Sequence, residues 1–154
     1  MENPLAKLIP YVVGEYPKSF LKLYEKVVIP KGTNGETIKE SLWKAYEFGT
    51  VRHQGQKRRS GKPYFSDHCL QVANILAKWK MDHITVMAGL LHDTLEDTDT
   101  TLKDLNNYFG EDVTKLVDGV TKLGNIEFSS KQEKQAENYM KLLLSVAKDL
   151  RVII

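Results

Sequence analysis

The feature that most constrains the fold is an apolar run over residues 84–91 that leads directly into one histidine and three carboxylates. The histidine is His92, and the carboxylates are Asp93, Glu96 and Asp97. If the run is helical, four-residue spacing places Glu96 near His92. It also places Asp97 near Asp93. Core packing does not require such a cluster, because Asp and Glu are almost never fully buried unless they are paired or bind a metal. The alternative is a helix that ends at the surface with solvated carboxylates.

Helical periodicity also governs the rest of the chain. Apolar residues recur at helical spacing in six further segments, residues 19–28, 36–53, 66–79, 101–109, 112–123 and 130–150. The buried stripe of the segment 66–79 is expected to hold Cys69, Val72, Ala73, Leu76 and Trp79. No segment alternates as a strand does, and there is no βαβ pattern or internal repeat. At 154 residues, the chain is expected to form an all-α fold with a sizeable core.

The segment 66–79 brings a second histidine to the cluster. A helix capped by Ser66 or Asp67 would carry His68 in its first turn. The connection to the next helix, around residues 81–82, is short, so the two helices are expected to be antiparallel. The start of one helix then lies beside the end of the other, which places His68 near His92 and Asp93. Two imidazoles and a carboxylate suit Mn, Fe, Co, Ni or Zn. The alternative for His68 is a hydrogen bond to the backbone.

The two remaining histidines are expected to be structural. His53 continues a core stripe formed by Ile38, Leu42, Ala45 and Gly49, which predicts a half-buried histidine with satisfied hydrogen bonds. His83 has no candidate partners and is expected at the surface.

Charge is distributed unevenly, although the net charge is only +2. Residues 51–64 hold five basic residues and no acidic one, whereas residues 92–112 hold seven acidic residues and one lysine. The guanidinium groups of Arg58 and Arg59 can grip phosphate bidentately or stack on a base. A basic loop beside an acidic cluster suits a phosphorylated substrate and a cation; the alternative is two solvated faces of opposite sign. The net charge gives no argument for nucleic acid or a membrane surface.

Together these residues indicate metal-assisted hydrolysis of a phosphate ester. A divalent ion with an open position lowers the pKa of bound water and supplies hydroxide near neutral pH. Glu96 and Asp97 could position that water or take its proton. The chain has no GxxxxGK[ST] loop, no GxSxG elbow and no Ser or Cys at a recognisable spacing from a base. A covalent mechanism is therefore unsupported.

The expected environment is the reducing cytoplasm. Cys69 is the only cysteine, which excludes an intramolecular disulfide. The N-terminus lacks the basic segment and apolar core of a signal peptide, and no apolar run approaches membrane-spanning length. These features predict a soluble cytoplasmic protein. The chain ends in an apolar run, residues 152–154, without a cap signal, and we expect it to be cut short of a longer sequence. The alternative is a natural terminus that tucks its last residues into the core.

Three stretches resemble the hydrolase domain of the long bacterial Rel/SpoT alarmone enzymes, within the HD superfamily of metal-dependent phosphohydrolases. They are HQGQ with RRSGKPY in residues 53–64, HDTLEDT in residues 92–98 and LVDGVTKL in residues 116–123. The likeness runs from about residue 40 to the end. It implies an HD-type helical bundle over residues 36–154, truncated at its C-terminus, after an N-terminal helical extension over residues 1–35.

The resemblance implies a Mn²⁺-dependent pyrophosphohydrolase that removes the 3′-diphosphate of ppGpp or pppGpp. The products would be GDP or GTP, together with pyrophosphate. His68, His92 and Asp93 match three of the family's metal ligands. Glu96 and Asp97 match its catalytic acidic pair.

Arg58 and Arg59 match the family's basic pair that contacts the guanine nucleotide, and Ser60 lies beside them. The chain departs from the family at Cys69, where proline is usual, at Lys62, where glutamate is frequent, and at Arg59, where lysine is common. In the family a fourth ligand, an aspartate, and further nucleotide contacts follow the point where this chain stops. The synthetase and regulatory domains come later still. Loss of a carboxylate ligand weakens metal binding, so we expect this chain to hold Mn²⁺ weakly or not at all and to be poorly active.

Two other functions stay open at this point. The pocket could sense guanine nucleotide without turnover and signal to other domains, or the domain could be an HD phosphohydrolase of ordinary nucleotides. The pair Glu96 and Asp97 argues against a sensor, which has no need of it. The stretch 116–123 and the basic loop argue against ordinary nucleotides.

Overall fold

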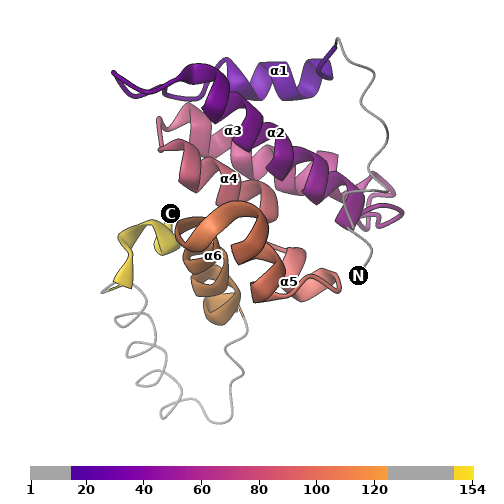
Figure 1. Ribbon diagram of the computed structural model, residues 1–154. Coiled ribbons are helices and arrows are strands. Elements are labelled where there is room, and N and C mark those ends of the chain that lie inside the picture. The colour runs from indigo at the N-terminus through magenta and orange to yellow at the C-terminus, as the bar shows by residue number, and fades with distance from the viewer. Residues whose placement is uncertain (1–14, 125–147) are drawn as a thin grey trace.

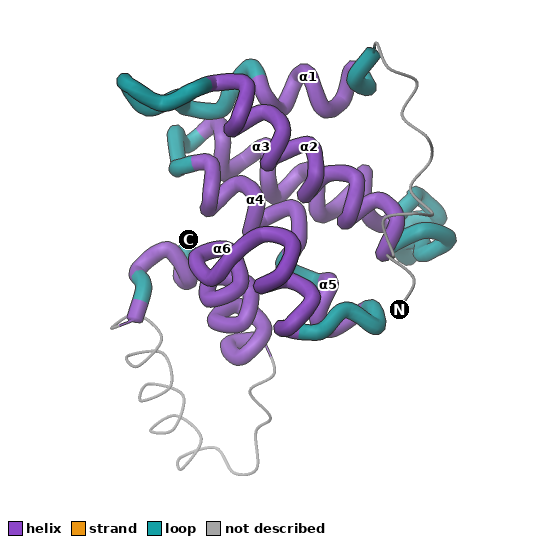
Figure 2. The backbone as a smooth tube through the Cα atoms, viewed as in Figure 1, coloured by secondary structure: helices purple, strands orange, loops and turns teal. Residues whose placement is uncertain are grey.

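The computed structural model describes residues 15–124 and 148–154, and this part of the chain is built from helices joined by turns and loops (Figure 1). The elements are α1 (Lys18–Tyr24), α2 (Gly35–Arg52), the π-helix η2 (Phe65–Cys69), α3 (Leu70–Lys78), α4 (His83–Leu91), α5 (Thr94–Asp97), α6 (Leu102–Gly124) and the 3-10 helix η3 (Leu150–Ile153). Figure 2 shows no strand among the described residues; their only β-type pairing is an isolated bridge between Lys57 and Pro63. The predicted all-α fold is confirmed.

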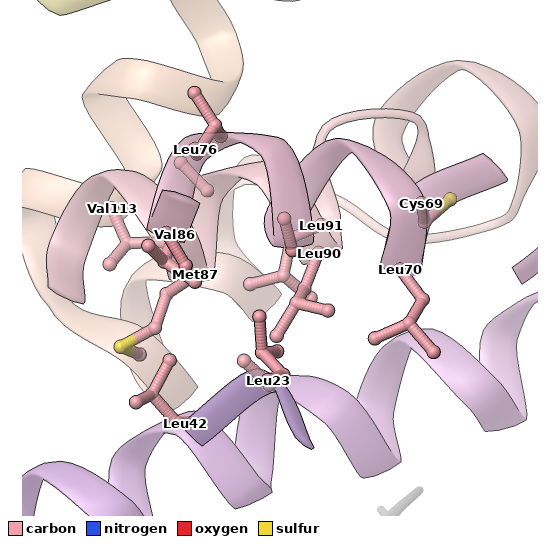
Figure 3. Packing of buried hydrophobic residues seen from close by; sticks show 14 of the residues in the cluster. Leu23, Leu42, Cys69, Leu70, Leu76, Val86, Met87, Leu90, Leu91 and Val113 are labelled. Atoms are coloured by element: carbon pink, nitrogen blue, oxygen red, sulfur yellow. The ribbon is translucent and has the colours of Figure 1, made fainter. Parts of the chain in front are cut away.

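Helix α4 lies at the centre of the fold. Every residue from Thr85 to Leu91 is buried, and the helix packs against α2, α3 and α6. In Figure 1, α1 and α2 lie on one side of α3 and α4, and α6 lies on the other side. Figure 3 shows Leu90 and Met87 of α4 directed toward Leu23 of α1 and Leu42 of α2. The apolar run identified in the sequence is therefore the core helix of the fold.

Helix α1 belongs to the same core, because Phe20 and Leu23 are fully buried against it. The helix was predicted to end at residue 28, but it ends at Tyr24 and is followed by a turn. The boundary that the sequence suggested between residues 35 and 36 stays a prediction.

The predicted helices 101–109 and 112–123 are both present within α6, where non-helical backbone at Gly110 separates them. The backbone at Gly110 has φ 82° and ψ 176°, a conformation that glycine adopts without steric cost. The predicted cap is confirmed: the Thr101 N–H donates to Asp104 Oδ2 at 2.9 Å, and the Asp104 N–H donates to Thr101 Oγ1 at 3.2 Å.

The predicted cap at Ser66 or Asp67 is wrong. Helical backbone already begins at Tyr64, with φ −60° and ψ −52°, so both residues lie inside the first turn. That turn is the π-helix η2, and such wider turns occur frequently at functional sites.

The predicted burial of Trp79 is also wrong, because the residue is 59% exposed. Helix α3 ends at Lys78, and the chain reverses through Lys80, which has a φ of 61°. Trp79 therefore follows the last helical residue and leaves the stripe. The rest of the stripe is buried or packed against the core, namely Cys69, Val72, Ala73 and Leu76.

The described C-terminal residues pack against α6 and contact the start of α4. Val152 is buried, and the Arg151 guanidinium lies 3.1 Å from a carboxylate oxygen of Asp82. Asp82 also caps α4, because its other oxygen accepts from the Thr85 N–H at 2.8 Å. Most of the predicted helix 130–150 lies outside the described residues. No helix in the described ranges is long and apolar enough to cross a membrane.

Candidate metal centre

The ends of three helical elements meet beside the core. Helix α4 ends so that His92 is its C-cap residue, and Asp93 is the N-cap residue of α5. His68 lies in η2, which runs directly into α3. Because α3 packs against α4 and only residues 79–82 connect them, the start of one lies beside the end of the other. The predicted helical hairpin is confirmed.

The side chains of His68, His92 and Asp93 converge at this point. The two Nε2 atoms lie 3.1 Å apart, and Asp93 Oδ2 lies 3.1 Å from His68 Nε2 and 3.0 Å from His92 Nε2. Among the described residues, this is the one group of three potential ligand atoms that all lie within 4.8 Å of each other. The structure thus brings together the three residues that the sequence placed side by side.

The hydrogen bonding of His92 leaves its converging nitrogen free to act as a ligand. His92 Nδ1 donates to the carbonyl oxygen of Gly89 at 2.9 Å. In the neutral imidazole this bond leaves the lone pair on Nε2. Histidines that bind metals are usually supported in this way through their other ring nitrogen.

Burial and neighbouring charges set the protonation of the three groups. Burial raises the pKa of Asp93, but hydrogen bonds from His92 and Tyr64 outweigh it and hold the pKa at about 2. Burial lowers the pKa of His68 despite the nearby Asp93, and the charges of His92 and Arg58 add to that effect. Burial also lowers the pKa of His92, but the hydrogen bond and charge of Asp93 outweigh it and raise the pKa. Asp93 is therefore an anion at neutral pH, as a metal ligand must be.

This donor set fits a divalent transition-metal ion. Two imidazole nitrogens and a carboxylate form a mixed N/O site, and three protein ligands leave coordination positions open. Of these three side chains, that of His68 is the most exposed, at 30%, against 16% for His92 and 17% for Asp93.

Glu96 and Asp97 lie one helical turn beyond the converging residues. The backbone N–H groups of both donate to the carbonyl oxygen of Asp93, at 3.2 and 2.9 Å, so the expected four-residue spacing holds between Asp93 and Asp97. Helix α4 ends at Leu91 and α5 begins at Thr94, so no single helix joins His92 to Glu96. Both side chains are exposed and lie outside the converging group. Partial burial, followed by the charges of Asp93 and Asp97, raises the pKa of Glu96. That direction favours proton transfer near neutral pH.

The basic loop forms a wall of a cleft of about 840 Å³ that reaches His68. The loop folds back on itself, because the Arg58 N–H donates to the Lys62 carbonyl at 2.9 Å and the Gly61 N–H donates to the Arg58 carbonyl at 2.8 Å. The cleft is lined by Lys57, Arg58, Arg59, Ser60, Lys62, Tyr64, Asp67 and His68. The predicted substrate-binding residues and one predicted metal ligand thus share one cleft.

Two residues of this cleft were not identified from the sequence. The Tyr64 hydroxyl donates to Asp93 Oδ2 at 2.7 Å; burial and this bond raise the pKa of Tyr64 well above its usual range. The Asp67 carboxylate lies 3.3 Å from Lys62 Nζ and 3.9 Å from Arg58 Nε. Tyr64 lies in the stretch RRSGKPY that resembles the family, but nothing local gave this aromatic residue a role, and Asp67 had the pattern of a helix cap.

His53 is fully buried, where the sequence predicted a half-buried residue, and its hydrogen bonds are not all satisfied. Its Nδ1 lies 2.7 Å from Gln56 Oε1, and Gln56 Nε2 donates to the Asp97 carbonyl at 2.7 Å. His53 Nε2 is buried without a hydrogen-bond partner in the described part of the chain, so full satisfaction was a wrong prediction. His83, expected at the surface, is half-buried.

Comparisons with known proteins agree on one family. A family model described as HD domain matches residues 45–154. The chain is 54% identical over 115 residues to a guanosine-3′,5′-bis(diphosphate) 3′-pyrophosphohydrolase of Aquifex aeolicus, which covers 75% of this chain and 16% of that relative. It is 49% identical over 114 residues to a GTP pyrophosphokinase of Myxococcus xanthus, and the match covers 72% of this chain and 15% of that relative. It is 46% identical over 113 residues to the bifunctional (p)ppGpp synthase/hydrolase SpoT of Escherichia coli, and the match covers 73% of this chain and 16% of that relative. The chain spans 15–16% of the length of these curated relatives.

Proposed function

Because this chain belongs to the HD-domain family, we propose that it is a Mn²⁺-dependent hydrolase that removes the 3′-diphosphate of guanosine 3′,5′-bis(diphosphate). Water adds to the phosphorus attached to the ribose 3′-oxygen. The bond between this phosphorus and the 3′-oxygen breaks, and the 3′-oxygen takes up a proton. The products are GDP and pyrophosphate from ppGpp, or GTP and pyrophosphate from pppGpp. The convergence of His68, His92 and Asp93 within about 3 Å carries this proposal.

We assign His68, His92 and Asp93 as three protein ligands of the ion. A divalent ion bound there supplies Lewis-acid activation of water and of a phosphoryl oxygen. The mixed donor set is compatible with Mn²⁺, which accepts imidazole and carboxylate ligands together.

The acidic pair and the basic loop supply the remaining chemistry. Glu96 accepts the proton of the attacking water, a role supported by its raised pKa and its place one turn beyond Asp93. Asp97, the next residue, orients that water. Arg58 and Arg59 bind the nucleotide through bidentate or stacking contacts, and Ser60 adds a hydroxyl donor.

The choice of substrate rests on the cleft and on the relatives. The basic cleft reaches His68, so phosphates bound there lie next to the assigned ligands. Two of the relatives carry (p)ppGpp hydrolysis in their names. We assign the hydrolase domain to residues 36–154, with residues 1–35 as its N-terminal extension.

Hydrolysis of ppGpp by the purified chain tests the proposal. With Mn²⁺ in excess, we expect slow release of GDP and pyrophosphate in equal amounts, because three protein ligands hold the ion weakly, and we expect none with excess EDTA or in the His92→Ala variant. Glu96→Gln combined with Asp97→Asn should abolish hydrolysis and retain nucleotide binding. Binding of ppGpp by the unaltered chain with no turnover would instead support a sensor. Faster hydrolysis of GTP or ATP than of ppGpp would support an enzyme of ordinary nucleotides.

A further inference from the structure

Tyr64 lies between the basic loop and the converging residues and contacts both. Its backbone N–H donates to the Gln56 carbonyl at 2.9 Å. Its ring stacks on His53, with 5.1 Å between centroids and 29° between planes. Its ring also meets His68 edge-on, at 5.4 Å and 64°. The Tyr64 side chain is thus held by two imidazoles and by its own backbone.

The Tyr64 hydroxyl reaches the oxygen on which the site converges. It donates to Asp93 Oδ2 at 2.7 Å, and this oxygen is the one that lies 3.0–3.1 Å from both imidazole Nε2 atoms. A carboxylate attached only through its own side-chain torsions can rotate. A donor on a fixed ring restricts that rotation and orients the remaining lone pairs.

A second hydrogen-bonded bridge holds the base of this arrangement. Gln56 Nε2 donates to the carbonyl oxygen of Asp97, so its Oε1 is the atom that accepts from His53 Nδ1. The loop that carries Tyr64 is therefore bonded to residue 97, while Tyr64 itself bonds residue 93. Both ends of the short segment 93–97 are fixed to the same loop.

We propose that Tyr64 is a positioning residue of the cation centre: its hydroxyl holds the Asp93 carboxylate in the orientation in which His68, His92 and Asp93 share one divalent ion. This role rests on the proposed function, because it requires the cation centre assigned above. Tyr64 does not itself contact the ion or the substrate in this role. It strengthens cation binding by restricting the carboxylate before the ion arrives.

The test is the affinity of the protein for Mn²⁺ alone, measured by competition with a fluorescent chelator. Tyr64→Phe keeps the ring between His53 and His68 and removes only the hydroxyl. We expect the dissociation constant for Mn²⁺ to rise about 10–100-fold, the usual cost of losing a hydrogen bond to a metal ligand. Co²⁺ bound to the variant should also show a changed visible spectrum, since the geometry around the ion changes.

Two variants complete the design. Tyr46→Phe removes a tyrosine hydroxyl whose partner is Ser19, at 2.8 Å, and should bind Mn²⁺ like the unaltered protein. His92→Ala removes an assigned ligand and should lose saturable binding. Circular dichroism at the titration temperature must show that every variant is folded. A change in the dissociation constant then cannot result from unfolding of the variant.

The outcomes separate the two proposals. If Tyr64→Phe binds Mn²⁺ within about twofold of the unaltered protein while His92→Ala does not bind it, the role of Tyr64 is overturned and the cation centre stands. Because three ligands are expected to hold the ion weakly, Mn²⁺ is titrated to millimolar concentration. If His92→Ala then binds Mn²⁺ as well as the unaltered protein does, or if neither shows saturable binding, the centre itself is overturned, and the role of Tyr64 falls with it.

Discussion

Gly49 sets how closely α2 approaches the element that carries His68. A Cβ atom at Gly49 would lie 2.4 Å from Cε2 of Phe65 and 3.0 Å from the carbonyl oxygen of Leu90. Non-bonded carbons normally stay about 3.5 Å apart, so Gly49→Ala requires the Phe65 ring to withdraw by about 1 Å. The ring is buried and also meets Tyr46 edge-on at 5.2 Å, which leaves little room for it to move.

Two opposing effects decide the stability of Gly49→Ala. Alanine is better than glycine inside a helix by about 1 kcal/mol. Overpacking a core costs about 1–3 kcal/mol, and contact with both a buried ring and a backbone carbonyl places this case at the upper end. We therefore expect a net loss of about 2 kcal/mol in the free energy of unfolding. At roughly 2–4 °C per kcal/mol for a chain of this size, the Tm falls by about 4–8 °C.

Thermal and urea unfolding measure this loss, with Thr50→Ala, an exposed neighbour on α2, as the control for helix propensity. Because Phe65 begins η2, its displacement should also weaken Mn²⁺ binding. Phe65→Leu shortens the side chain, so the double variant should recover part of the loss, with a coupling of about 1 kcal/mol. A Gly49→Ala protein that is as stable as the unaltered one, or strictly additive effects in the double variant, would refute the reasoning.

Three further predictions concern charge at the site. Asp67→Asn removes the carboxylate that pairs with Arg58 and Lys62. Because an exposed ion pair is worth up to about 1 kcal/mol, pyrophosphate binding measured by calorimetry should tighten up to about fivefold. Unchanged or weaker binding would contradict this prediction. Since the folded-state pKa of Asp93 is about 2, below its ordinary value of 3.8, its ionised form stabilises the fold by about 2 kcal/mol above pH 4. That stability is lost as the pH falls toward 2, so urea unfolding of the Asp93→Asn variant should show a smaller loss over this window; parallel curves would count against it. Mn²⁺ must displace a proton from His92, whose pKa is raised, so the affinity for Mn²⁺ should increase from pH 6 to pH 8; an affinity independent of pH would contradict it.

The sequence predicted those parts of the site that depend on local spacing. The apolar run 84–91 identified the core helix, and the short connection near residue 81 placed His68 beside His92. Both inferences need only helical geometry and a tight turn, which short-range sequence determines.

The parts that the sequence did not predict depend on contacts between distant segments. Tyr64 and Asp93 are 29 residues apart, and Gln56 and Asp97 are 41 apart. No periodicity connects such pairs, because they meet only after the loop folds back over α5. Trp79 was misplaced for a more local reason, since the left-handed backbone at Lys80 ends the helix without a glycine to mark it.

Asp82 and Arg151 have a consequence for the order in which the fold assembles. Their side chains meet across 69 residues of chain, whereas the α3–α4 hairpin forms from neighbouring segments. During synthesis from the N-terminus, every residue of the hairpin leaves the ribosome before Arg151 does. We therefore expect the ion pair between Asp82 and Arg151 to form late in folding. Removing it should accelerate unfolding more than it slows folding.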